Sequence, residues 1–172
     1  MTKPKYVIVV GIDYSAASEH ALEEAFTLGA AKHGVQLHVV NVRSAPDEEL
    51  AWPVASTTDA KPLPPWRYWA SELQEFVARK VAAFEATGAT PFEHLYTHQR
   101  VNDPAHELAQ LAINVGADLV VLGTHEWHGE SQPRAGSVAE IVTRLAPCPV
   151  LIVRRKTVLW PAPANEPHLS PS

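Results

Sequence analysis

The chain has 172 residues, 46% of them hydrophobic, and a formal net charge of −5 at pH 7. This length and composition suit one globular domain with its own core, while the acidic balance leaves no basic patch for nucleic acid and no polybasic segment for a membrane surface. No apolar run approaches the ~20 residues that a bilayer-spanning helix needs. The N-terminus lacks the apolar segment and cleavage site of a signal peptide, and the single cysteine, Cys148, cannot form an internal disulfide. We therefore expect a cytoplasmic protein.

The first strand and helix are predicted from the beginning of the chain. The short, β-branched run YVIVVGI (residues 6–12) is typical of a buried parallel strand. Asp13 and Ser15 follow it, and either side chain can cap the helix that comes next. Gly34 is expected to end that helix. Its apolar face has helical spacing and consists of Ala17, Ala21, Leu22, Ala25, Leu28 and Ala31.

A second strand, VQLHVVNV (residues 35–42), precedes a long stretch without periodicity. That stretch, residues 43–65, is polar and rich in proline, and insertions of such length are usually functional, mobile or engaged with a partner. Trp52 and Trp66 lie in or beside it. The two rings either mark a contact surface or fold back onto the domain.

Two more helices flank a third strand in the middle of the chain. Apolar residues at helical spacing predict a helix over residues 68–87. The run FEHLYTH (residues 92–98) alternates apolar and polar side chains, which suits an edge strand with one solvated face. Asp103 and Pro104 then form an N-cap and a first helical position, so a third helix is expected over residues 105–115.

The segment ADLVVLGTHEWHGESQPRAGS (residues 117–137) joins a buried strand, a glycine turn, a loop and the start of a helix. The strand is LVVL, and Gly123 ends it. Ser137 begins the amphipathic helix VAEIVTRL and, with Glu140 three residues later, fits a capping box. Ser137 is therefore either a helix cap only, or a cap whose neighbouring backbone N–H groups hold phosphate oxygens.

A last strand over residues 149–153 completes an alternation of strands and helices. This order predicts an α/β fold in which a doubly wound, five-stranded parallel sheet carries helices on both faces. The domain is expected to cover residues 1–154, followed by a proline-rich tail, residues 155–172. Ligands of such sheets bind beyond the carboxyl ends of the strands. Asp13 and Gly123 lie at two such ends, so their loops face one cleft if the first and fourth strands are neighbours.

Four segments taken together resemble the universal stress protein family, across about residues 5–154. The resemblance implies a Rossmann-like sheet with strand order 3-2-1-4-5, a stress-response function and a homodimer formed through the last strand. The four segments are VIVVGIDYSAASEHALEEA (7–25), LHVVNV (37–42), VNDPAHELAQLAINVGADLVVLGTH (101–125) and GSVAEIVTRLAPCPVLIVR (136–154).

Nucleotide-binding members of that family share the pattern Gly-x2-Gly-x9-Gly-Ser/Thr. Here Gly123, Glu126, Gly136 and Ser137 keep its register, with Glu126 in place of the second glycine. A glycine lets the backbone approach phosphates without a Cβ, whereas a carboxylate adds charge that repels them. Asn102 is a second departure, because the family often has glycine at this position.

The resemblance implies a site for ATP, ADP or AMP, with Mg²⁺, between the loops that follow the first and fourth strands. Asp13 matches the aspartate that contacts the nucleoside, and Val39 matches the position whose backbone meets the adenine. Ser137 and Val138 match the helix start that contacts phosphates. The full set of residues expected at the site is Ile12, Asp13, Tyr14, Val39, Gly123, Thr124, Glu126, Gly136, Ser137 and Val138.

Three functions stay open at this point. The first is a non-enzymatic, dimeric stress-response protein that binds an adenine nucleotide as a regulatory ligand. The second is a nucleotide-free module of the same fold for dimerisation or partner docking. The third is a weak ATP hydrolase, although the sequence shows no clear set of catalytic base and orienting group.

Other chemistries have weaker support. His125 and His128, with Glu126 and Glu130 nearby, form either a metal cluster or a solvated loop, and the known zinc spacings are absent. The acidic pair of a phosphorelay receiver, the G-x-G-x-x-G motif of dinucleotide oxidoreductases and the G-x-S-x-G nucleophile elbow are also missing.

Overall fold

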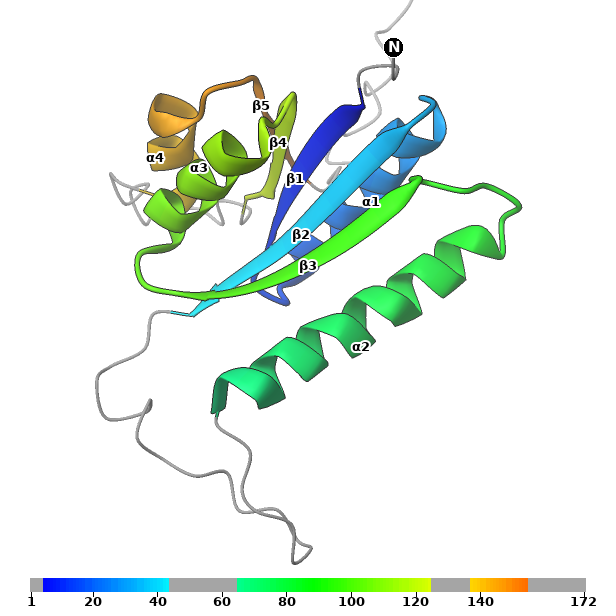
Figure 1. Cartoon of the computed structure of the whole chain (residues 1–172), viewed down its shortest axis with the longest axis horizontal. Helices are drawn as coiled ribbons and strands as arrows, with labels where there is room; N and C mark the ends of the chain where they lie inside the picture. The colour runs from blue at the N-terminus through cyan, green and yellow to red at the C-terminus, as the bar shows by residue number, and fades with distance from the viewer. Residues whose placement is uncertain (1–4, 44–64, 125–136, 155–172) are drawn as a thin grey trace, which may run out of the picture.

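The computed structural model describes residues 5–43, 65–124 and 137–154 (Figure 1). Within these ranges, strands and helices alternate as the sequence predicts. The elements are β1 (Tyr6–Ile12), α1 (Ala16–Ala30), β2 (Val35–Arg43), α2 (Pro65–Glu85), β3 (His94–Val101), α3 (Pro104–Val115), β4 (Leu119–Gly123), α4 (Val138–Leu145) and β5 (Val150–Val153).

The five strands form one parallel sheet in the order β3-β2-β1-β4-β5, which confirms the predicted fold class and strand order. In the register of the central strands, Val10 of β1 lies between Val39 of β2 and Val121 of β4. The chain winds outward from β1 to β3 on one side and returns through β4 to β5 on the other. The carboxyl ends of β1 and β4 therefore form the switch point at which α/β sheets bind ligands.

Helices cover both faces of the sheet (Figure 1). On one face α1 and α2 pack over a core that includes Leu22, Phe26 and Leu73, each with no measurable exposure. On the other face α3 and α4 pack over a second core, to which they contribute Leu108 and Val142. Successive strand residues point to opposite faces, so the continuous apolar runs of β1 and β4 supply both cores at once.

The start of α1 agrees with the sequence analysis, whereas its end does not. Ser15 is the N-cap, and its Oγ accepts a hydrogen bond from the N–H of Ser18 at 3.2 Å. The helix ends at Ala30, with Ala31 as the C-cap, so the prediction that Gly34 ends it is wrong. Gly34 instead adopts a left-handed φ of +71° in the turn that enters β2, a conformation in which glycine pays no Cβ penalty.

Two other elements differ from their predicted bounds by two or three residues at each end. Helix α2 covers residues 65–85 rather than 68–87, and β3 covers residues 94–101 rather than 92–98. The shift of β3 follows from its pairing with β2, which runs from His94 opposite Gln36 to Val101 opposite Arg43. Alternation of polarity locates a strand, but its ends depend on the neighbouring strand.

The predicted Asp103–Pro104 start of α3 is confirmed. Asp103 Oδ1 accepts a hydrogen bond from the N–H of His106 at 2.9 Å, and Gly116 ends the helix in a left-handed conformation. The insertion at residues 44–64 and the proline-rich tail at residues 155–172 lie outside the described residues. In the part of the chain that is described, no helix has the length and apolar character needed to cross a membrane.

Candidate functional site

A cavity of about 490 Å³ lies at the carboxyl ends of β1 and β4, at the switch point of the sheet. This volume is within the range of pockets that bind small molecules. Its lining comes from the end of β1 and the first turn of α1 (Gly11, Ile12, Asp13, Ser18), from β2 (Val40, Val42), from α3 (Pro104, Leu108), from β4 and its end (Leu122, Gly123, Thr124), and from the start of α4 (Ser137, Val138, Ala139).

The cavity combines apolar walls with few polar groups. Val40, Val42, Leu108 and Leu122 form apolar surface from three different elements. Asp13 is the only charged side chain among the described residues that line it. Apolar walls with a small number of placed polar groups are typical of sites that bind small organic molecules.

Two glycines allow the surrounding elements to come close. A Cβ on Gly11 would lie 2.6 Å from a methyl group of Leu122 and 3.1 Å from one of Leu108. A Cβ on Gly123 would lie 2.3 Å from the backbone carbonyl of Ala17 and 2.6 Å from the backbone nitrogen of Ser18. Gly123 is therefore required because the end of β4 packs directly against the first turn of α1.

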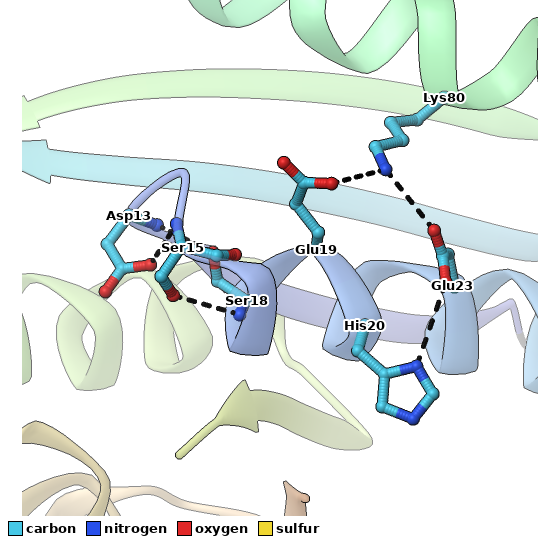
Figure 2. A network of polar contacts seen from close by, with 7 residues as sticks. All are labelled: Asp13, Ser15, Ser18, Glu19, His20, Glu23 and Lys80. Atoms are coloured by element: carbon cyan, nitrogen blue, oxygen red, sulfur yellow. Dashed lines mark hydrogen bonds and ion pairs between the residues drawn. The ribbon is translucent and has the colours of Figure 1, made fainter. Parts of the chain in front are cut away.

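A hydrogen-bond network holds the loop that carries Asp13 (Figure 2). The N–H of Ser15 donates to Asp13 Oδ1 at 3.0 Å, and the N–H of Asp13 donates to Ser18 Oγ at 3.3 Å. The Ser18 hydroxyl, on a buried residue, donates to the backbone oxygen of Ser15 at 3.0 Å. These bonds fix the exposed Asp13 carboxylate at the rim of the cavity.

Residues from the first turns of three helices line this cavity, namely Ser18 of α1, Pro104 of α3 and Val138 of α4. The N-terminal end of a helix carries partial positive charge and favours anions. Ser137 is the N-cap of α4, and its Oγ accepts a hydrogen bond from the N–H of Glu140 at 3.2 Å. The predicted cap is thus confirmed, while contact of this helix start with phosphates stays a prediction.

The structure brings together six of the ten residues expected at the site. These are Ile12, Asp13, Gly123, Thr124, Ser137 and Val138. Of the six, Ile12 borders the cavity while its side chain belongs to the core beneath α1 and α2. Glu126 and Gly136 lie outside the described residues.

Tyr14 and Val39 are the two remaining residues of the expected set, and their side chains lie on the opposite face of the sheet, in the core that α1 and α2 cover. Val40, the next residue along β2, lines the cavity, while the contact of the Val39 backbone with adenine stays a prediction. The strict alternation of side chains along a strand could have identified Val40 once Val39 was assigned to the core. The contribution of Leu108 had no comparable signal, because it depends on how α3 packs.

No group of three or more His, Cys, Asp or Glu side chains in the described ranges is arranged to hold a metal ion. The His125 and His128 pair considered in the sequence lies outside those ranges. The described part of the cavity, with its apolar walls and few polar groups, has the character of a site for a small organic molecule.

The sheet, its helices and the cavity define a doubly wound α/β domain with a pocket at the switch point of its sheet. The profile of the universal stress protein family matches residues 6–154. The universal stress protein Rv2005c of Mycobacterium tuberculosis is 29% identical over 176 residues, which cover 98% of this chain and 55% of the relative. The universal stress protein YxiE of Bacillus subtilis is 29% identical over 157 residues, which cover 86% of this chain and 97% of the relative. The chain belongs to the universal stress protein family.

The chain spans about half the length of the first mycobacterial relatives that it matches, at 55% of each. Among solved structures, the universal stress protein UspA from Lactobacillus plantarum is 25% identical, with a TM-score of 0.58 over 88% of this chain and 100% of that chain. A universal stress protein in complex with cAMP is 24% identical, with a TM-score of 0.60 over 88% and 98% of the two chains. A family protein from Arabidopsis thaliana with AMP bound is 16% identical, with a TM-score of 0.57 over 92% and 97%. The last two resemble this chain in fold.

Proposed function

We propose that this protein is a stress-response protein that binds an adenine nucleotide in the cavity between the loops after β1 and β4, as a regulatory ligand. The observation that carries the proposal is the cavity itself, which combines apolar walls, one carboxylate and the N-terminal ends of helices. The family supports the proposal, because two proteins of the same fold have been solved with cAMP and with AMP.

The chemistry of the cavity suits the parts of such a ligand. The base would lie against the apolar side chains of Val42, Leu108 and Leu122, with loss of water from both surfaces. The Asp13 carboxylate would accept hydrogen bonds from hydroxyl or amino groups of the nucleoside. The phosphate end would lie toward the start of α4, where Ser137 and Val138 are exposed and the helix dipole favours an anion.

A regulatory role is proposed over hydrolysis because the sequence shows no clear set of catalytic base and orienting group. Asp13 is the only charged side chain among the described residues that line the cavity. Catalysed attack of water on a phosphate needs a positioned base or a metal held against the leaving group. Asp13 is accordingly assigned to ligand recognition.

We further propose that the protein forms a homodimer through its last strand. Strand β5 lies at the edge of the sheet, and Leu151 within it is 37% exposed. An edge strand leaves backbone donors and acceptors unpaired, and a second copy can supply partners for them. Light scattering of the wild type should give twice the monomer mass at micromolar concentration. A Leu151→Lys variant should give the monomer mass, and a wild type that is already monomeric would contradict the proposal.

Nucleotide binding is tested in two steps. Denaturation of the purified protein should release an adenine nucleotide into the supernatant, which chromatography would identify. Calorimetric titration with ATP, AMP and cAMP, with and without Mg²⁺, should then give a dissociation constant below the millimolar range for at least one of them.

Two variants locate the site of binding. Val42→Phe places a ring in the cavity and should abolish binding, while Ile113→Phe changes an exposed residue of α3, 54% accessible, and should leave it intact. Failure of the wild type to bind any of the three nucleotides would favour the alternative, a nucleotide-free dimerisation or partner-docking module of the same fold.

A further inference from the structure

Tyr14 has an unusual backbone conformation for an aromatic residue. It lies between Asp13 and Ser15, and its φ of +62° is in the left-handed region, where a bulky side chain crowds its own backbone. The chain turns here, so that Asp13 lines the cavity while the ring of Tyr14 enters the core beneath α1 and α2. A conformation of this kind persists only where the surroundings hold it.

The ring of Tyr14 is held by α2. It meets the ring of Phe76 edge to face, with the centroids 5.2 Å apart and an angle of 89° between the planes. Phe76 is itself buried. Edge-to-face pairs are directional as well as apolar, so this contact fixes the position of the Tyr14 ring and of the backbone that carries it.

One charged residue of β2, Arg43, and one of α2, Glu72, lie near the same ring. Arg43 Nη2 lies 2.6 Å from Glu72 Oε2, and the Arg43 guanidinium lies over the ring of Trp69, 5.0 Å from its centroid. Burial raises the pKa of the Tyr14 hydroxyl, and the nearby Glu72 raises it further, while Arg43 acts in the opposite direction. Tyr14 therefore stays neutral near pH 7, and no charge competes with its packing.

Ile12, the residue before Asp13, is also held in place, by side chains of β2 and β3. The amide nitrogen of Asn41 donates to the backbone oxygen of Ile12 at 2.7 Å. The amide nitrogen of Gln99 in turn donates to Asn41 Oδ1 at 2.9 Å. The backbone of Asp13 is thus fixed on one side by a polar chain across β2 and β3, and on the other by the contact of Tyr14 with α2.

We infer that Tyr14 is a positioning residue for Asp13, and that its contact with Phe76 couples the position of α2 to the affinity of the cavity for its ligand. The inference rests on the proposed function, because it needs a ligand whose binding involves Asp13. Displacement of α2 would release the ring of Tyr14, let the loop at residues 13–15 leave its strained conformation and move the carboxylate away from the rim. A shift of helix α2 is therefore expected to change the affinity of the cavity.

The first test needs no ligand. Amide hydrogen exchange would be measured in wild type, Tyr14→Ala and Phe76→Leu, with Tyr68→Ala as the control. Tyr68 is on the same helix and is 54% exposed. Exchange of the amides of residues 13–18 should be about fivefold faster in the first two variants, and that of residues 119–123 should be unchanged. Unchanged exchange at residues 13–18 in both variants would overturn the inference.

The second test measures affinity for AMP by calorimetry in the same proteins and in the double variant. Tyr14→Ala and Phe76→Leu should each weaken AMP binding about 5- to 20-fold. The double variant should lose no more affinity than the single variant with the larger loss, because both substitutions remove the same contact. Tyr68→Ala should bind as wild type does.

Additive losses, or unchanged affinity in both single variants, would overturn the coupling even if exchange at residues 13–18 is faster. If the wild type binds no nucleotide, the proposed function fails, and the exchange experiment alone decides whether α2 holds the loop.

Discussion

Substitution of Gly123 by alanine gives a quantitative test of how the cavity is built. The added Cβ would lie 2.3 Å from the backbone C and O atoms of Ala17, whereas ordinary contacts of this kind begin at 3.4 Å. Backbone atoms cannot rotate away, so β4 and the first turn of α1 must separate by about 1 Å. Overpacking that moves the backbone typically costs about 1–3 kcal/mol. We expect the free energy of unfolding to fall by at least about 2 kcal/mol.

Gly11→Ala is the matched control for Gly123→Ala. Its Cβ would also be too close to its neighbours, at 2.6 Å and 3.1 Å, but those neighbours are the methyl ends of Leu122 and Leu108. Side-chain ends can adopt other rotamers, so the loss of stability should be smaller. The two variants therefore distinguish a clash with backbone from a clash with side chains.

Thermal and urea unfolding are the assays for this pair. A loss of about 2 kcal/mol in a domain of this size lowers the midpoint by about 4–8 °C. A Gly123→Ala protein that is as stable as Gly11→Ala, or within about 0.5 kcal/mol of wild type, would refute the proposed packing of β4 against α1. AMP titration of Gly123→Ala should also show weaker binding, since both elements line the cavity.

Three further predictions follow from single residues. Asn102 has a φ of +140°, so Asn102→Gly should stabilise the fold by about 1 kcal/mol in urea unfolding, and a loss of stability would contradict this. Burial, and secondarily His98, lower the pKa of His38 from 6.5 to about 4. As the pH drops, His38 is therefore protonated in the unfolded chain before it is protonated in the folded one. The free energy of unfolding should fall by at most about 3 kcal/mol between pH 6.5 and pH 4. A His38→Phe variant should flatten this pH profile, and an unaltered slope would show that other groups cause it. From the sequence alone, Glu126→Gly should strengthen ATP binding more than AMP binding in calorimetry, because it removes a negative charge from the position at which the family pattern has a glycine near the phosphates; equal effects would contradict this.

The fold could be predicted from the sequence because its signals are local and repeated. Short β-branched runs alternate with amphipathic helices, and Asp103, Ser137 and Gly116 mark helix ends by capping chemistry. The end of α1 was missed because Ala31 caps it in an ordinary helical conformation, which leaves no mark in the sequence. Gly34 is required three residues later by the turn into β2.

The candidate site could be predicted only in part. Residues that follow strand ends, such as Asp13 and Thr124, lie at the cavity because parallel strands place their carboxyl ends at one edge. The direction of the Tyr14 side chain could not be read from the sequence, since it depends on a single left-handed residue and on the position of Phe76 in α2. The reason for glycine at position 123 could not be read from the sequence either, because the close neighbours of Gly123 in the structure belong to α1.

Chemical-shift mapping with AMP tests the central claim most directly. The protein would be isotopically labelled, and its backbone amide resonances would be followed during the titration. The account predicts that the largest shifts fall on Asp13, Gly123, Thr124 and Val138, which border the cavity, while residues of α2 beyond Phe76 move little. Shifts concentrated on the exposed face of β3, or no shifts at millimolar AMP, would contradict it.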